Sequence, residues 1–495
     1  MASSARRVVV IGGGTSGSVL AARLSEDPDV SVTVLEAGAD DSSYDSDIVE
    51  PARAAAKWRG GDAMHATPMQ FGEQSIPGLQ ARVLGGTSAI NGMATLRGLP
   101  EDYDAWAAAG LTGWSWSDVL ATFVDAEHDR DFGASEIHGG SGPLPVRRWR
   151  DDELSRAQLA FRDGLIAEGE RSVADINDPT QLPGLGVFPV TIDEADRRVS
   201  TSLAYLTPGV RQRDNLTIRT GAHVDRLAFD GSRAIGATLA DGSDIEADEI
   251  IVSAGALWTP VLLMRSGVGP ADHLADHGIG VRSDLPVGST MSDHLGPGLM
   301  YQHPGERGGT AGPAQTVLVG ASNGRDVDYH AFPIALPPDP DAPTTTFLLA
   351  VFLLRSSGAG SVRLGSDGAG PVVIAPPLPD DGAERLRHGF DRVMAWERSD
   401  AYARLGAEPV MPLDLGADGA VAEAIDRLTV SYGHMVGTCP MGTVLDAQCR
   451  VHGIEGLRVV DASVMPTIPS GNTYLGCVMV AERVAAMMTA ERGPT

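Results

Sequence analysis

Residues 8–24 read "VVVIGGGTSGSVLAARL", an apolar strand that runs through a glycine turn into a helix. A chain that opens in this order begins as a doubly wound α/β domain. The turn places Gly12, Gly14 and Gly17 at the spacing GxGxxG. The first glycine permits a tight turn, the second lets the backbone approach a pyrophosphate, and the third lets the helix pack close to the strand. The stretch therefore predicts a Rossmann-like domain that binds a dinucleotide.

A carboxylate follows at the distance that such a site requires. The second predicted strand, "SVTVLEAG", ends in Glu36, which lies nineteen residues after Gly17. At this position a carboxylate can accept the hydrogen bonds of an adenosine ribose. These two features fit either NAD or FAD.

The charge of the chain argues against a nucleic-acid partner. The 495 residues include 38 Lys and Arg against 65 Asp and Glu, a net charge of 38 minus 65, or −27, and the acidic residues are spread along the chain. With 43% hydrophobic residues, a chain of this length can bury a large core divided among about three domain-sized units. These values predict a large, acidic globular protein.

Neither a signal peptide nor a membrane span is expected. The first apolar run breaks into glycines after Ile11, and the run at 344–354 is shorter than the roughly 18 apolar residues of a membrane span. We therefore expect a soluble, cytoplasmic protein. Its cysteines, Cys439, Cys449 and Cys477, form neither a disulfide framework nor a zinc-ligand spacing, so we expect reduced thiols and no bound metal.

Two longer stretches distinguish the possible cofactors. Residues 82–93, "RVLGGTSAINGM", and residues 255–270, "GALWTPVLLMRSGVGP", resemble the first and second signatures of the glucose-methanol-choline family of FAD oxidoreductases. Residues 215–227 and 459–485 also match that family in order, so the resemblance covers nearly the whole chain. It implies FAD instead of NAD.

The resemblance also implies an α/β fold in which a Rossmann-like FAD-binding domain is joined to a second, α+β substrate domain built on an antiparallel sheet. We expect the discontinuous FAD-binding domain at 1–150, 200–300 and 426–495, and the substrate-binding domain at 151–199 and 301–425. An alternating apolar pattern and a helical run near 382–405 suit an antiparallel sheet with covering helices.

Carried over position by position, the family pattern assigns the cofactor contacts. It puts the ADP half of FAD on the glycine turn and Glu36, and the adenine beside the backbone of Val224. The flavin lies along the 82–93 stretch and beside Asp461 and Ala462. The full expected set is Gly12, Gly14, Thr15, Gly17, Glu36, Ala37, Arg82, Gly86, Thr87, Asn91, Gly92, Ala94, Val224, Ala254, Asp461, Ala462, Asn472 and Thr473. Some members carry a histidine that tethers the flavin covalently where this chain has Ile90, so non-covalent FAD is expected.

The catalytic residues follow from the chemistry and from the same resemblance. Oxidation of an alcohol requires a base for the hydroxyl proton, a role that suits histidine. The family base corresponds to His434, in "YGHMVGTCPMG". Asn472, in "PSGNTY", occupies a family position held by histidine or asparagine. Its amide can bond the substrate oxygen but cannot titrate, which leaves His434 as the only proton acceptor of the pair.

The expected activity is FAD-dependent oxidation of a primary or secondary alcohol to the aldehyde or ketone, with hydride transfer to flavin N5 and electrons passed to O2. Two alternatives stay open: a dehydrogenase that passes electrons to a quinone or protein acceptor, as in mycofactocin-associated members, and a hydroxynitrile lyase of the same fold. The sequence leaves the alcohol and the oligomeric state open.

Two further segments bear on the substrate. Phe347, Leu348, Val351 and Phe352 could line a pocket, although their pattern favours a role in the core. Residues 138–148, "HGGSGPLPVRR", resemble the loop that covers the flavin entrance in the family.

Overall fold

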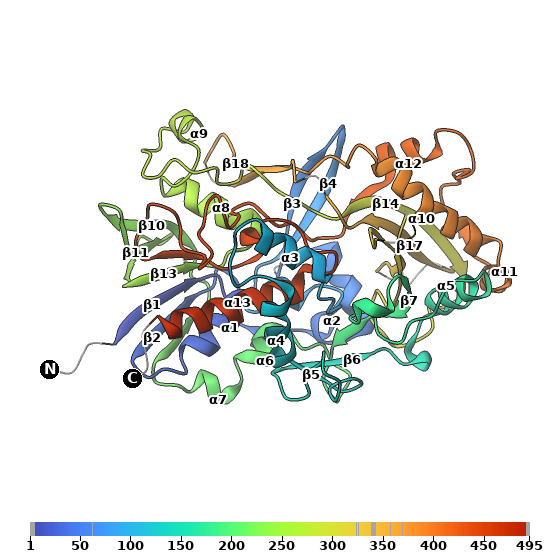
Figure 1. The fold of residues 1–495 in the computed structure, drawn as a ribbon, viewed down its shortest axis with the longest axis horizontal. Coiled ribbons are helices and arrows are strands. Elements are labelled where there is room, and N and C mark those ends of the chain that lie inside the picture. The colour runs from blue at the N-terminus through green and yellow to red at the C-terminus, as the bar shows by residue number, and fades with distance from the viewer. Residues whose placement is uncertain are drawn as a thin grey trace.

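A computed structural model describes residues 5–61, 63–322, 324, 326–337, 343–356, 358–368 and 370–491. Figure 1 shows a sheet containing β1, β2 and β13 at one end of the molecule and a sheet containing β14 and β17 toward the other. The α/β architecture with a separate antiparallel sheet is thus as the sequence predicted.

The first sheet is parallel and has the strand order β22-β13-β1-β2-β9. Its strands are β1 (Arg6–Ile11), β2 (Val30–Leu35), β9 (Leu216–Arg219), β13 (Glu249–Val252) and β22 (Leu457–Val459). Continuous Val and Ile runs suit strands that are covered on both faces. Helix α1 (Thr15–Leu24) packs on β1 and β2, and α13 (Thr473–Ala490) packs on α1. This is the Rossmann-like domain.

The second large sheet is antiparallel, with the order β20-β14-β17-β16-β15-β7, and β21 pairs with β14. Its strands are β7 (Gly184–Val187), β14 (Leu295–Pro304), β15 (Thr316–Gly320), β16 (Tyr329–Ala335), β17 (Thr344–Leu353), β20 (Glu408–Pro409) and β21 (Thr429–Ser431). Helices α5 (Arg156–Ala167), α10 (Gly382–Glu397), α11 (Asp400–Leu405) and α12 (Ala420–Leu428) cover one face. The helical run expected near 382–405 is therefore confirmed.

Side chains on β17 alternate between the two faces of this sheet, because successive residues of a strand point in opposite directions. Phe347 and Val351 pack against the covering helices, as the apolar pattern favoured. Phe352 packs with the cluster on the opposite face, against which Leu348 also lies. That opposite face is turned toward the candidate site.

Three smaller sheets accompany the two large ones. They comprise β3 (Met64–Phe71), β4 (Gln74–Ala81), β18 (Ser361–Leu364) and β19 (Pro371–Ile374); β5 (Glu127–Asp129), β6 (Leu144–Arg148) and β8 (Pro189–Thr191); and β10 (Val224–Asp230), β11 (Arg233–Leu239) and β12 (Asp244–Glu246). Because β19 pairs with β3, a part of the expected substrate domain shares a sheet with the expected FAD-binding domain. The proposed domain boundaries stay a prediction.

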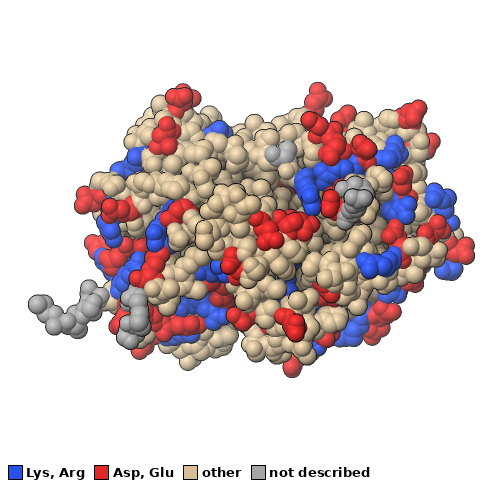
Figure 2. Space-filling view, viewed as in Figure 1, with Lys and Arg blue, Asp and Glu red and all other residues tan. Residues whose placement is uncertain are grey.

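Short helices complete the chain. They are α2 (Ser46–Val49), α3 (Pro100–Ala108), α4 (Trp116–Ala126), α6 (Thr201–Tyr205), α7 (Pro208–Arg211), α8 (Gly255–Arg265) and α9 (Ala271–Asp276). Within the described ranges, no helix has the length and apolar character needed to cross a membrane. On the face drawn in Figure 2, basic side chains lie among acidic ones.

Candidate active site

A cavity of about 650 Å³ receives residues from both large sheets. The glycine turn after β1 and the first turn of α13 line it on the side of the parallel sheet, and β16, β17 and residues near β21 line it on the other. Every cofactor residue expected from the sequence, except Gly17, lies on its wall, as does His434. Segments separated by hundreds of residues thus meet around one space.

Most glycines of the two stretches leave no room for a side chain. A Cβ atom added to Gly17 would lie 1.9 Å from the carbonyl oxygen of Gly12, which explains why Gly17 packs helix against strand and does not reach the cavity. A Cβ on Gly86 would lie 2.6 Å from the Cα of Gly14. The two glycine stretches are therefore in backbone contact, and the N–H of Gly85 donates to the carbonyl of Gly13 over 2.8 Å. Together they form a narrow cradle suited to a pyrophosphate.

Glu36 lines the same end of the cavity and is buried. Its carboxylate accepts hydrogen bonds from the backbone N–H of Gly13 (2.9 Å) and of Gly38 (2.7 Å). Burial raises the pKa of Glu36, and the two N–H donors counteract that effect. The side chain therefore also holds the glycine turn in place, a structural role that the spacing alone did not indicate.

Asp461 joins two of the stretches that the sequence assigned to the cofactor. One carboxylate oxygen accepts from the backbone N–H of Gly255 (2.8 Å) and the hydroxyl of Thr259 (2.6 Å), at the start of α8. The other accepts from the backbone N–H of Ser463 (2.8 Å). Both carboxylate oxygens of Asp461 thus accept hydrogen bonds from protein groups. These bonds hold the backbone around Asp461 in place on the cavity wall.

His434 and Asn472 lie side by side on the wall of the cavity. The Nε2 of His434 is 3.1 Å from the amide nitrogen of Asn472, and both side chains are buried. The ring of His434 stacks on Tyr432 with a centroid distance of 4.0 Å. The Oδ1 of Asn472 is buried without a hydrogen-bond partner among the described residues. A buried orphan acceptor beside a cavity is a position where a bound molecule can supply the missing donor.

A second histidine, His294, determines which nitrogen of His434 carries hydrogen. The Nε2 of His294 lies 2.9 Å from the carbonyl oxygen of Leu354, which can only accept, so this nitrogen must be the donor. Burial lowers the pKa of His294 to about 3, so the ring is neutral and its Nδ1 is an acceptor. The Nδ1 of His434, at 2.9 Å, must then be the donor. The Nε2 of His434 is left with a lone pair.

The surroundings of His434 keep the ring uncharged. Burial lowers its pKa well below 6.5, and the neighbouring His294 and His330 add to that effect. The backbone N–H of His434 donates to the carboxylate of Asp293 over 2.9 Å, which fixes the loop. At neutral pH the site therefore holds a neutral imidazole whose Nε2 accepts a hydrogen bond from the amide of Asn472.

Sequence reasoning missed three residues that support this arrangement. Asp293 and His294 adjoin in "SDHLGP", but nothing in the local pattern relates them to a histidine 140 residues later. Arg198 is buried and donates to the side-chain oxygen and the carbonyl of Asn91 (2.8 and 2.6 Å), so it holds the stretch at 82–93 against the cavity. An isolated buried arginine has no signal in a single sequence.

The four uncertain residues on β17 all contribute to the core, and two of them also line the cavity. Leu348 and Phe352 lie on the cavity wall and pack in a hydrophobic cluster as well. Phe347 and Val351 lie in the core, as expected. Residues 138–148, expected over the flavin entrance, are not among the described residues that line this cavity, and part of the segment forms β6.

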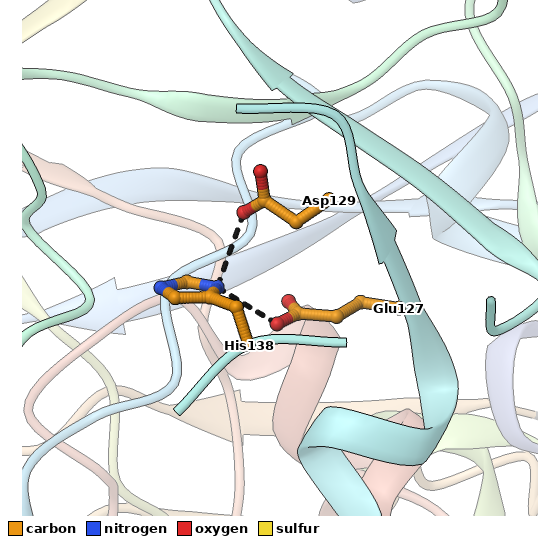
Figure 3. Close-up of side chains that lie close together, drawn as sticks. All are labelled: Glu127, Asp129 and His138. Atoms are coloured by element: carbon orange, nitrogen blue, oxygen red, sulfur yellow. Dashed lines mark hydrogen bonds and ion pairs between the residues drawn. The ribbon is translucent and has the colours of Figure 1, made fainter. Parts of the chain in front are cut away.

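His138, at the start of that segment, belongs to a separate charged cluster. Its Nδ1 lies 2.8 Å from Glu127 and 3.1 Å from Asp129 (Figure 3), and its Nε2 lies 2.7 Å from Asp175. Burial disfavours the charged ring, but hydrogen bonds to the three carboxylates outweigh it and raise the pKa of His138 to about 10. Both ring nitrogens are therefore donors.

The same cluster is balanced in charge. Arg97 pairs with Glu127, and Arg148 pairs with Asp129 and Asp175. Two guanidinium groups and an imidazolium thus oppose three carboxylates. A cation would have to displace those partners, so the group of Glu127, Asp129 and His138 is an ion-pair cluster and does not offer a metal site.

Comparison with known proteins places this site in context. Two family models described as GMC oxidoreductase match residues 7–296 and 356–481. The chain is 32% identical to a 5-(hydroxymethyl)furfural oxidase of Methylovorus sp., over 96% of this chain and 97% of that protein. It is also 32% identical to an oxygen-dependent choline dehydrogenase of Escherichia coli, over 97% and 95%. A solved structure of pyridoxine 4-oxidase from Mesorbium loti is similar with a TM-score of 0.88 and 30% identity, over 99% of this chain and 100% of that one.

Proposed function

Because the chain belongs to the GMC oxidoreductases, FAD-dependent enzymes that act on alcohol CH–OH groups, we propose that it oxidises a primary or secondary alcohol to the aldehyde or ketone. The observation that carries this proposal is the buried pair of His434 and Asn472 on the wall of a cavity that a glycine cradle also lines. The pair supplies a base, and the glycine cradle fits a dinucleotide.

The residues present fit FAD. The cradle of Gly12, Gly14 and Gly86 would hold the pyrophosphate, and Glu36 would receive the ribose. The first turns of α1 and α13 both line the cavity, and helix N-termini favour negative charge. When bound there, FAD supplies the acceptor for the hydride that leaves the alcohol carbon.

Residues of the chain itself bind the hydroxyl group of the alcohol and accept its proton. The lone pair on Nε2 of His434 takes the hydroxyl proton, while Nδ1–H stays bonded to His294. The amide of Asn472, held 3.1 Å from that Nε2, donates to the alcohol oxygen and aligns it. The buried surroundings exclude water, so the proton passes to His434.

We further propose non-covalent FAD and O2 as the electron acceptor. Ile90, on the cavity wall, has no nucleophilic atom that could tether a flavin. The names of two relatives, an oxidase and an oxygen-dependent dehydrogenase, support oxygen. After acid precipitation the flavin should remain in the supernatant, and yellow colour retained on the polypeptide would contradict this. A quinone or protein acceptor is the alternative, and reoxidation of the reduced enzyme in air, with and without an artificial quinone, separates the two.

A single-turnover experiment tests the function. Anaerobic flavin reduction by the best alcohol should slow by about 10² to 10⁴ fold in His434→Ala, the contribution of a general base, with FAD still bound. Asn472→Ala should slow it less, and Asn472→His should retain activity. A His434→Ala enzyme that reduces its flavin at the wild-type rate would exclude this mechanism. If no alcohol reduces the flavin, the hydroxynitrile lyase alternative is favoured.

A further inference from the structure

The wall next to His434 is aromatic. Tyr432 stacks on His434, and Phe352 stacks on Tyr432 with a centroid distance of 4.4 Å and an interplanar angle of 17°. Phe332 lies 5.2 Å from Tyr432, and Phe188 lies 5.3 Å from Phe332. All these rings line the cavity. A continuous aromatic surface therefore begins at the base.

Aliphatic side chains extend this wall along the antiparallel sheet. Ile334 on β16 and Leu348 on β17 are directly paired neighbours and both line the cavity. Leu336, Val430 and Ala314 continue the same surface. They point inward because the face opposite the covering helices is the face turned to the cavity.

Among the described residues, the charged side chains that line the cavity lie away from this aromatic and aliphatic wall. Glu36 is held by backbone N–H groups, and Arg82 is near enough to lower its pKa. Arg265 pairs with Asp225 at the start of β10. Asp461 is bonded to the first turn of α8, as described above. These groups surround the glycine cradle and the cofactor stretches, and none of them adjoins the aromatic wall in the contacts of the described residues.

The carboxylate nearest to the base also faces away. One oxygen of Asp293 accepts the backbone N–H of His434, the other accepts the hydroxyl of Ser431, and Asp293 does not line the cavity. Burial raises its pKa to about 7, so it is only partly charged at neutral pH. It is therefore a poor partner for a cation bound in front of His434.

Nor do the rings form a cage for a cation. A quaternary ammonium group is held by the open faces of several aromatic rings. Both faces of Tyr432 are covered, one by His434 and the other by Phe352. Phe332 and Phe188 meet edge to face, at an interplanar angle of 82°. The wall offers apolar contact to a neutral group and no compensation for a desolvated charge.

We propose that the alcohol is uncharged, with an apolar or aromatic skeleton, and that the site discriminates against alcohols that carry a fixed charge. This inference rests on the proposed alcohol oxidation. The proposed substrate thus differs in charge from choline, which the name of one relative gives as its substrate, although the two proteins are 32% identical.

The test uses matched pairs of alcohols on the FAD-loaded enzyme. Choline is compared with 3,3-dimethylbutanol, in which carbon replaces the charged nitrogen, and 4-carboxybenzyl alcohol is compared with benzyl alcohol. We expect kcat/KM to be higher for the neutral member of each pair by at least about 100-fold, since burial of an unpaired charge is costly. Equal or better turnover of either charged member would overturn the proposal.

A variant on the wall supplies the reciprocal test. Leu348→Glu should narrow the gap between choline and its neutral isostere, because it adds a carboxylate to a half-buried position. The matched control Leu348→Met should preserve the gap. A gap unchanged by Leu348→Glu would place substrate away from this wall. If charged alcohols are oxidised, only this inference fails, whereas failure of every alcohol to reduce the flavin removes the proposed function.

Discussion

The Nδ1 atoms of His294 and His434 lie 2.9 Å apart, and only one of them carries a hydrogen. The carbonyl of Leu354 determines which, because it requires a donor on the other side of the His294 ring. A backbone oxygen thus determines, through two imidazoles, that Nε2 of His434 carries the lone pair, which accepts from the amide of Asn472. His294 is a positioning residue: it acts on the base, and not on the alcohol.

Replacing His294 should therefore affect the rate more than substrate binding. His294→Leu leaves the buried Nδ1–H of His434 without an acceptor, which costs about 1 to 3 kcal/mol, so kcat should fall by roughly 5 to 150 fold with little change in KM. His294→Gln retains an acceptor oxygen and should recover much of the rate. Steady-state kinetics of the two variants check this. Equal losses in both would contradict a role in orienting the tautomer.

The acid limb of the pH profile should lie unusually low. Burial, together with His294 and His330, lowers the pKa of His434 well below 6.5, so the neutral base persists to a lower pH than an exposed histidine would. The acid-side midpoint of kcat/KM, which reports the enzyme before substrate binds, should fall below pH 6.5. A midpoint at or above 6.5 would show that His434 is more hydrated than in this structure.

Glu36 should control the affinity for FAD. Glu36→Ala removes a charged hydrogen-bond acceptor and should weaken FAD binding by about 1.5 to 3 kcal/mol, while turnover at saturating FAD changes little. The loss includes the restraint on the glycine turn, since the carboxylate accepts from Gly13 and Gly38. Titration of the apoprotein with FAD measures the effect. Glu36→Gln, which keeps one acceptor oxygen, should bind more tightly than Glu36→Ala.

The His138 cluster should stabilise the fold in a pH-dependent manner. The pKa of His138 is raised to about 10, so its contribution is complete below the unfolded value near 6.5 and is lost as pH rises toward 10. His138→Gln should lower the free energy of unfolding by about 3 to 5 kcal/mol near pH 6. The difference from wild type should shrink above pH 10. Urea unfolding at both pH values measures it, and a difference independent of pH would mean that the ring is neutral.

Features encoded by contiguous residues were predictable. The parallel sheet and the glycine turn follow from apolar runs and glycine spacing within a few residues, and the turn formed as expected. The apolar run of β17 was also readable, but the sequence does not say which face of the strand meets a cavity and which meets helices. For that reason Phe347, Leu348, Val351 and Phe352 were all given the same core role, although Leu348 and Phe352 also line the cavity.

Features that depend on contacts between distant segments could not be predicted from the sequence. The pairing of β19 with β3 joins strands about three hundred positions apart, and local pattern carries no record of such a partner. The same holds for His294, whose importance arises only when β14 and β21 bring their flanking residues together. His434 was found because its segment matches the family, whereas no matched segment pointed to His294.

The order of the strands in the parallel sheet also bears on how the protein is made. Strand β1 occupies the centre of that sheet, yet β22, which pairs with β13 at the edge, and the helix that begins after Asn472 follow β1 by hundreds of residues. Because synthesis proceeds from the N-terminus, the nascent chain exposes the unpaired edge of β13 until these elements leave the ribosome. Closure of the cofactor site thus has to wait until β22 and α13 have been synthesised.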